Sequence, residues 1–160
     1  MISTKLYNIF DNIILSNERS YNYNHKSKFG THIAVVMNNK YDIITSGVNH
    51  VELKKSVHAE IDAVSKLPYK KNKNKNKKRI ILFVARLSKT SIIGESRPCW
   101  HCLINAYKIA LNKGYKIQYI IHSTSNQNLI KKKYIDIVNE PHQHISYHWS
   151  KQNYTIGNVC

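Results

Sequence analysis

The sequence predicts an α/β protein with a single mixed β-sheet of about five strands and helices packed on it. The chain has 160 residues, 42% of them hydrophobic, which suits one domain with a buried core and is too short for two. Segments with apolar residues at helical spacing alternate with apolar runs of strand length. One run, Ile80–Ala85, is uninterrupted, as in a central strand covered on both faces. We therefore expect residues 1–160 to form a single domain.

The first part of the chain predicts a helix followed by a β-hairpin. Apolar residues in segment 6–14 recur at spacings of three and four, which indicates an amphipathic helix of about four turns. A polar loop follows over residues 17–30. Ile33–Met37 and Tyr41–Val48 are the next apolar segments, and a short Asn-Asn turn separates them. Two strands joined by so few residues should pair antiparallel.

Two further segments, Val57–Val64 and Leu103–Leu111, have apolar residues at helical spacing and are predicted to be helices. Pro68 ends the first because proline cannot continue a helix. Gly114 ends the second because glycine commonly follows the last helical residue. The residues suited to the helix starts are Ser56, as a cap of the first, and Pro98, in the first turn of the second.

The second half of the chain predicts two more strands. Residues 87–96 are expected to form a loop, Ile117–His122 a strand, and the residues from Leu129 onward a final strand. The link TSNQN between these strands is short, so we expect them to pair antiparallel. The tail 141–160 shows too little periodicity for an assignment.

Residues 70–79, KKNKNKNKKR, carry seven positive charges and no acidic or apolar residue. Such a segment has nothing to bury and is predicted to be a disordered surface insert. The whole chain has 25 Lys and Arg against 9 Asp and Glu, a formal charge of +16. This excess favours anionic partners such as nucleotides, nucleic acids or acidic membrane surfaces. A compositional bias towards Lys, Asn, Ile and Tyr explains it equally well.

Cysteine usage indicates the cellular setting. Cys99 and Cys102 form a C-x-x-C pair and Cys160 stands alone, so the chain has no disulfide framework. This pattern is typical of a reducing, intracellular environment in which the pair serves a metal or redox role. The sequence shows no signal peptide and no apolar stretch of membrane-spanning length. We expect a soluble, cytoplasmic protein without a membrane partner.

His58, Cys99 and Cys102 are candidate metal ligands. One imidazole and two thiolates are ligands that zinc prefers, and three protein ligands leave a fourth position open for water. Because the two cysteines are three residues apart, the first turn of a helix would place both sulfurs on one face. The helix N-terminus also favours the thiolate form. The alternatives are a structural zinc site, which normally has a fourth protein ligand, and buried thiols without a metal.

Glu60 suggests a catalytic rather than a structural site. A carboxylate beside a zinc-bound water can take the water's proton and pass it on. Residues i and i+2 of a regular helix diverge, so His58 must stand at the helix entrance if both side chains are to face one site. The alternative is an acidic residue that complements the helix macrodipole.

These motifs match the H-x-E…P-C-x-x-C signature of zinc-dependent nucleobase deaminases. The sequence resembles the cytidine/deoxycytidylate deaminase superfamily over roughly residues 29–130. The resemblance includes G-V-N at 47–49, H-A-E-I-D-A-V at 58–64 and S-R-P-C-W-H-C at 96–102. The strand and helix order is also that of the family, and the resemblance implies a three-layer sandwich. An antiparallel final strand would resemble the cytidine deaminase branch.

The resemblance implies a role for each matching residue. His58, Cys99 and Cys102 would hold one zinc ion per chain, and Glu60 would shuttle protons. Asn49 would hydrogen-bond the sugar, although an ordinary turn residue is an alternative. The backbone N–H groups of Ala59 and Cys99 would contact the base or the metal-bound oxygen.

The implied reaction is hydrolytic deamination of cytidine, CMP or dCMP. In this reaction, water activated by zinc attacks C4 of the ring. Glu60 protonates N3 and then the leaving ammonia, and the uracil compound remains. One alternative is deamination of a base within RNA or DNA, such as a tRNA adenosine or a polynucleotide cytosine. Another is a catalytically inactive zinc-binding module. The family also leads us to expect a homo-oligomer. Two features depart from the family pattern: the long interval of 41 residues from His58 to Cys99, and Ser96-Arg97 before the P-C pair.

Overall fold

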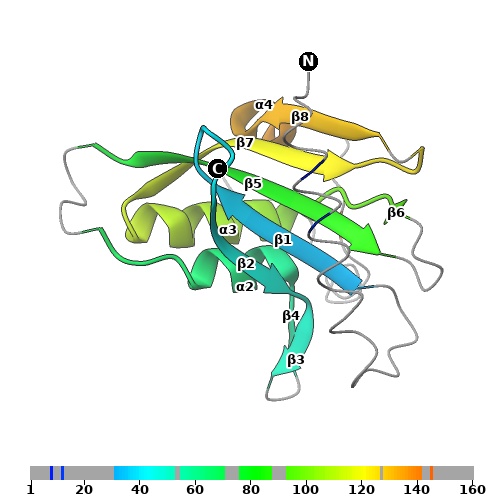
Figure 1. Ribbon diagram of the computed structural model, residues 1–160, viewed down its shortest axis with the longest axis horizontal. Helices are drawn as coiled ribbons and strands as arrows, with labels where there is room; N and C mark the ends of the chain where they lie inside the picture. Colours follow the sequence, from blue (N-terminus) through cyan, green and yellow to red (C-terminus); the bar gives the residue numbers. More distant parts are fainter. Residues whose placement is uncertain are drawn as a thin grey trace.

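A computed structural model describes residues 31–52, 55–70, 76–87, 93–126 and 128–141, together with residues 8, 12 and 145. The main strands are β1 (Thr31–Met37), β2 (Ile43–Val48), β5 (Lys78–Leu87), β7 (Tyr115–Ser123) and β8 (Leu129–Lys133). They form one sheet in the order β2–β1–β5–β7–β8 (Figure 1). Because β5 and β7 are parallel and the other neighbours along this path are antiparallel, the sheet is mixed. The predicted fold class is confirmed.

β1 and β2 form the predicted antiparallel hairpin. Asn38 organises the turn between them, because its Oδ1 accepts the N–H groups of Lys40 at 2.8 Å and Asp42 at 3.0 Å. Tyr41, within this turn, has a φ of 63°, in the left-handed region that bulky residues rarely adopt. Side-chain hydrogen bonds therefore stabilise a turn that contains no glycine.

β5 is the central strand, and every residue of Ile80–Ala85 is 1% exposed or less, as predicted for a strand covered on both faces. Helix α3 (Trp100–Asn112) lies between β5 and the parallel strand β7 in the chain. Gly114 follows α3 with a φ of 89°, a conformation that glycine adopts without steric cost. The prediction for Pro98 was wrong by two positions: it precedes the N-cap residue Cys99 and lies outside the first helical turn.

β8 pairs antiparallel with β7, as predicted. The chain then forms a short helix, α4 (Tyr134–Val138), where the sequence indicated only a strand. This helix is shorter than the two turns needed to show an apolar period. It is stabilised by packing, because Ile137 is fully buried and the Tyr134 ring stacks on Tyr107 at a centroid distance of 4.3 Å.

A small hairpin that the sequence did not predict connects β2 to the next helix. It consists of β3 (His50–Glu52) and β4 (Lys55–Val57) and projects away from the main sheet (Figure 1). Helix α2 (Ala59–Ser65) follows it. The prediction that Val57 belongs to this helix was wrong, because Val57 pairs with His50 in the hairpin. Ser56 is likewise not the cap, since it lies in β4 and the N-cap position is occupied by His58.

Both faces of the sheet are buried. One face packs against α2, α3 and α4 in a single apolar cluster that includes Val36, Leu82 and Ile120. The opposite face is a second cluster that includes Val35 and Phe83. The three described helices therefore share one face of the sheet, and the third layer of the expected sandwich is not tested by the described residues.

The predicted boundaries of the insert, 70 and 79, were wrong because they include residues that belong to the fold. Lys78 and Arg79 belong to β5, where they pair with β7, and the N–H of Lys70 donates to the carbonyl of Lys113 at 3.0 Å. All of its described residues are exposed, as expected for a surface segment. Residues 71–75 lie outside the described residues.

Four other predictions fall wholly or partly outside the described residues. Among these are most of the expected N-terminal helix at 6–14, all of the expected loop at 17–30 and most of the tail 141–160. Within the expected loop 87–96, residues 88–92 lie outside them, while a short strand β6 (Ile93–Gly94) pairs with the end of β5. In the part of the chain that the structure describes, no helix is long and apolar enough to cross a membrane.

Candidate metal centre

The starts of α2 and α3 supply the candidate metal ligands. His58 is the N-cap residue of α2, with extended backbone angles of φ −78° and ψ 149°, and Cys99 is the N-cap residue of α3, with φ −70° and ψ 154°. The two helices pack against each other on the same face of the sheet (Figure 1). His58 therefore stands at the helix entrance, which is the condition that the sequence set for His58 and Glu60 to face one site.

The structure brings His58, Cys99 and Cys102 together. Nδ1 of His58 lies 3.0 Å from Sγ of Cys102 and 3.9 Å from Sγ of Cys99, and the two sulfurs are 2.9 Å apart. Both cysteines are 4% exposed. Among the described residues, no fourth potential ligand, whether a histidine, a cysteine or an acidic side chain, joins this group. The neighbouring His101 is not part of it, and its ring lies edge-on to Trp100 at 5.4 Å.

The donor atoms suit zinc in kind, since imidazole nitrogen and thiolate sulfur are its usual ligands. Two zinc–sulfur bonds of about 2.3 Å at a tetrahedral angle separate the sulfurs by about 3.8 Å. The two thiols would therefore move apart by about 1 Å to accept the ion. Three neighbouring donors on two helix starts can accommodate such a shift by small side-chain rotations.

The thiols differ in acidity. The hydrogen bond shared with Cys102, followed by the bond with His58, lowers the pKa of Cys99 to about 4. The same sulfur–sulfur hydrogen bond and burial raise the pKa of Cys102. Cys99 also accepts the N–H of Cys102 at 3.3 Å as the cap of α3. The pair therefore offers one thiolate to a cation, and metal binding would release the proton of the other thiol.

Glu60 is the second residue of α2 and is only 2% exposed. Burial raises the pKa of its carboxyl to about 7. Its Oε2 atom is buried and has no hydrogen-bond partner in the described structure. An unpartnered buried polar atom carries a large free-energy cost, so such an atom in a native site usually has a ligand, water or catalytic role. This orphaned oxygen is the second observation that fits a metal ion and its water at this site.

In the chain, Ala59 directly follows the candidate ligand His58, and Asn49 precedes it by nine residues. Ala59 is the fully buried first residue of α2, so its N–H is one of the helix-start donors without an intrahelical partner. Asn49 follows β2 and is exposed; its N–H donates to the carbonyl of His32 at 3.1 Å, and its Oδ1 accepts the N–H of His32 at 2.6 Å. The side chain thus has a structural role, and the bonds to His32 leave its NH₂ group for a ligand.

Two buried hydroxyl groups, those of Ser96 and Ser123, hold the chain segment that precedes Cys99. The sequence did not predict this pair. Ser96 is 2% exposed, its Oγ lies 2.7 Å from the carbonyl oxygen of Val84 and 2.7 Å from Oγ of Ser123, and it accepts the N–H of Ser123 at 2.9 Å. These contacts attach the segment before Cys99 to the ends of β5 and β7. The sequence showed Ser96 only as a departure from the family pattern, and its partners are too distant in the chain to be inferred.

The comparisons with known proteins are sparse. No family model matches the chain, and no curated protein matches it. Among solved structures, the fold is similar to a 1.6 Å crystal structure of cytidine deaminase from Burkholderia pseudomallei, with a TM-score of 0.43 and 14% sequence identity. The alignment covers 71% of this chain and 82% of that one.

Proposed function

We propose that the chain is a zinc-dependent hydrolase that removes the amino group from the cytosine of cytidine, CMP or dCMP. The observation that carries this proposal is the convergence of His58, Cys99 and Cys102 beside a buried glutamate whose Oε2 has no hydrogen-bond partner among the described residues. A structural zinc site is normally closed by a fourth protein ligand. Within the described residues this group has three, which leaves room for a reacting water.

Each residue of the site has a defined task in this proposal. His58, Cys99 and Cys102 hold the zinc ion, which when bound supplies Lewis-acid activation of a water molecule. The carboxylate of Glu60 takes a proton from the attacking water and delivers it to ring N3. It then takes the remaining proton of the new C4 hydroxyl and delivers it to the leaving amine. A C4–O bond forms and the C4–N bond breaks, so cytosine and water give uracil and ammonia. A pKa of about 7 for Glu60 suits a group that both accepts and donates protons near neutral pH.

Backbone and side-chain donors around the ligands orient the substrate in this proposal. The N–H groups of Ala59 and Cys99, each at a helix start, contact the base in this proposal, and the NH₂ group of Asn49 contacts the sugar. Donors at helix N-termini are not used by the helix itself and favour electronegative ligand atoms.

A base within RNA or DNA is a second candidate substrate, favoured by the net charge of +16. Purified protein should first be analysed for zinc, with one ion per chain expected. It should then be incubated with cytidine, CMP, dCMP, single-stranded RNA and single-stranded DNA while uracil and ammonia are measured. Turnover of the monomers supports the proposal, whereas turnover of the polymers alone supports the second candidate.

Glu60→Gln tests the proton-transfer role. This variant should keep its zinc and lose about 10²- to 10⁴-fold in kcat, the usual contribution of general acid–base catalysis. Asp136→Asn, which changes an exposed acidic residue in the first turn of α4, is the matched control and should retain full activity. A zinc-replete wild-type protein that turns over none of the substrates would refute the proposal and favour an inactive zinc-binding module.

A further inference from the structure

The end of β2 lies directly against α2. A Cβ atom added to Gly47 would lie 2.3 Å from the backbone N of Ala63 and 2.6 Å from the carbonyl oxygen of Ala59. Such distances are far below van der Waals contact, so only glycine permits this approach. Oγ1 of Thr45 also donates to the carbonyl of Ala63 at 2.8 Å. The middle of β2 is therefore held on α2 by direct backbone contact.

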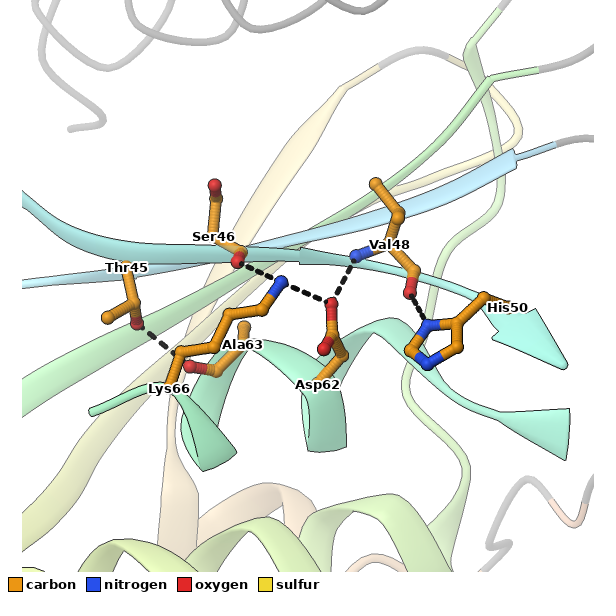
Figure 2. A network of polar contacts seen from close by, with 7 residues as sticks. All are labelled: Thr45, Ser46, Val48, His50, Asp62, Ala63 and Lys66. Atoms are coloured by element: carbon orange, nitrogen blue, oxygen red, sulfur yellow. Dashed lines mark hydrogen bonds and ion pairs between the residues drawn. The ribbon is translucent and has the colours of Figure 1, made fainter. Parts of the chain in front are cut away.

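Asp62 extends this attachment to the last residue of β2. Its Oδ2 accepts the N–H of Val48 at 3.1 Å and the ammonium of Lys66 at 2.7 Å. Nζ of Lys66 also donates to the carbonyl of Ser46 at 3.3 Å. Figure 2 shows the two side chains reaching from α2 to the backbone on both sides of residue 47. The pair thus fixes Ser46 and Val48, the two neighbours of Gly47.

Asp62 is also hydrogen-bonded to the backbone of the candidate metal ligand His58. Its backbone N–H donates to the carbonyl of His58 at 3.0 Å, the first hydrogen bond of α2. Its carboxylate holds Val48, and the next residue is Asn49, the candidate sugar contact. Asp62 therefore connects the backbone of a candidate zinc ligand to the backbone that carries a candidate substrate contact.

The other contacts near Asn49 do not replace this connection. Asn49 is bonded to His32 of β1, which sets its position relative to the sheet but not relative to α2. Nδ1 of His50 lies 3.1 Å from the carbonyl oxygen of Val48 (Figure 2), a contact within the same short segment. The Lys66 side chain is 54% exposed and that of Asp62 is 13% exposed. Since an ion pair with one exposed partner contributes modestly to stability, and Gly47 and Thr45 still hold β2 on α2, loss of Asp62 should leave the fold intact.

We propose that Asp62, with Lys66 as its partner, is a positioning residue that sets the substrate-contacting end of β2 relative to the metal-ligating start of α2. It controls how tightly the nucleoside or nucleotide is held, and it acts through Asn49 without touching the substrate. This inference rests on the proposed function and deepens it. Gly47 and Thr45 hold the body of β2, so the effect of Asp62 is confined to Val48 and Asn49.

The test compares Asp62→Ala, Asp62→Asn and Lys66→Met with wild type, with Asp136→Asn as the control. Asp62→Ala should raise KM about tenfold while kcat stays within about threefold, because uniform binding of substrate and transition state is lost. Asp62→Asn keeps an acceptor for the N–H of Val48 and should fall between wild type and Asp62→Ala. Lys66→Met should have the smallest effect of the three. The control should match wild type in both constants.

Two readouts do not depend on activity. Amide hydrogen exchange at Val48 should become about tenfold faster in Asp62→Ala than in wild type, since its acceptor is removed. Zinc content and resistance to a chelator should be unchanged. Equal exchange rates, or loss of zinc together with substrate affinity, would overturn the inference. If wild type deaminates no substrate, the proposed function and the substrate role fall together, and the exchange rates still decide whether Asp62 fixes β2.

Discussion

At the scale of single residues, the most unusual feature is a carboxyl that is buried where its charge is costly. Glu60 is 2% exposed, and burial raises its pKa to about 7. Proteins accept such a cost where a group must exchange protons near neutral pH. Ionisation of this buried carboxyl destabilises the folded state, so the free energy of unfolding should depend on pH.

Glu60 should therefore make the metal-free protein less stable as the pH rises from 4.5 to 8. This contribution is measured as the difference from Glu60→Gln, because the lowered pKa of Cys99 acts in the opposite direction over the same range. Unfolded chains ionise this carboxyl above pH 4.5, whereas the folded chain keeps it protonated up to about pH 7, so folding becomes less favourable in that window. The shift corresponds to a loss on the order of 3 kcal/mol. Glu60→Gln should abolish this component and be more stable than wild type at pH 8. Urea unfolding across this range, with chelator present, measures the difference; parallel curves for the two proteins would contradict it.

At the scale of elements, the position of the site depends on how closely β2 approaches α2. The close contact at Gly47 allows the residues after β2 to reach the start of α2, where the candidate ligand His58 and the candidate shuttle Glu60 stand. A side chain at position 47 would meet backbone atoms of Ala59 and Ala63, which cannot rotate away. The strand or the helix would have to move.

Gly47→Ala should consequently destabilise the fold by about 1–3 kcal/mol, the usual cost of overpacking, and lower activity by separating Asn49 from α2. The measurement is urea unfolding together with KM. Gly94→Ala is the matched control, because a Cβ there would approach only the flexible side chain of Arg86, at 3.5 Å. Equal stability of the two variants would show that the helix can shift without cost.

The sequence predicted the longer elements and missed the shorter ones. β1, β2, α3 and β7 were predicted because each is long enough to show its apolar period. The hairpin of β3 and β4, the strand β6 and helix α4 have two to five residues each, less than a period can reveal. Val57 was misplaced for the same reason: its spacing to Ile61 suited a helix, while its actual partner, His50, lies across the hairpin.

The candidate site was also predicted only in part, because the sequence shows residues that are close in the chain and hides pairs that only the fold brings together. His58 with Glu60 and Cys99 with Cys102 each have a short local spacing at a helix start, so each pair was visible in the sequence. The two pairs were grouped, across 41 residues, by the signature that they resemble together. Asp62 and Ser96 act through partners that only the fold brings near. Val48 lies 14 residues from Asp62 and Ser123 lies 27 from Ser96, and no local pattern encodes such pairs.

At the scale of the whole molecule, one carboxylate joins three parts of the chain: the segment after α4, strand β8 and the segment before α3. Glu140, just after α4, forms an ion pair with Arg97, which lies two residues before Cys99. It forms a second ion pair with Lys132 of β8, at 2.5 Å. The Glu140 side chain is 23% exposed. In a chain of net charge +16, an acidic group between two cations also reduces local repulsion.

Glu140→Gln should lower stability at pH 7 by about 1 kcal/mol, a value typical of partly exposed ion pairs. The hydrogen bond from Lys132, followed by the charge of Arg97, lowers the pKa of Glu140 below its usual 4.5. The unfolded chain therefore takes up this proton first as the pH falls below 4.5, and the stabilisation is lost there. Urea unfolding of the metal-free protein should show a smaller acid-side loss for Glu140→Gln than for wild type. An unchanged profile for Glu140→Gln would show that the bridge contributes nothing to stability.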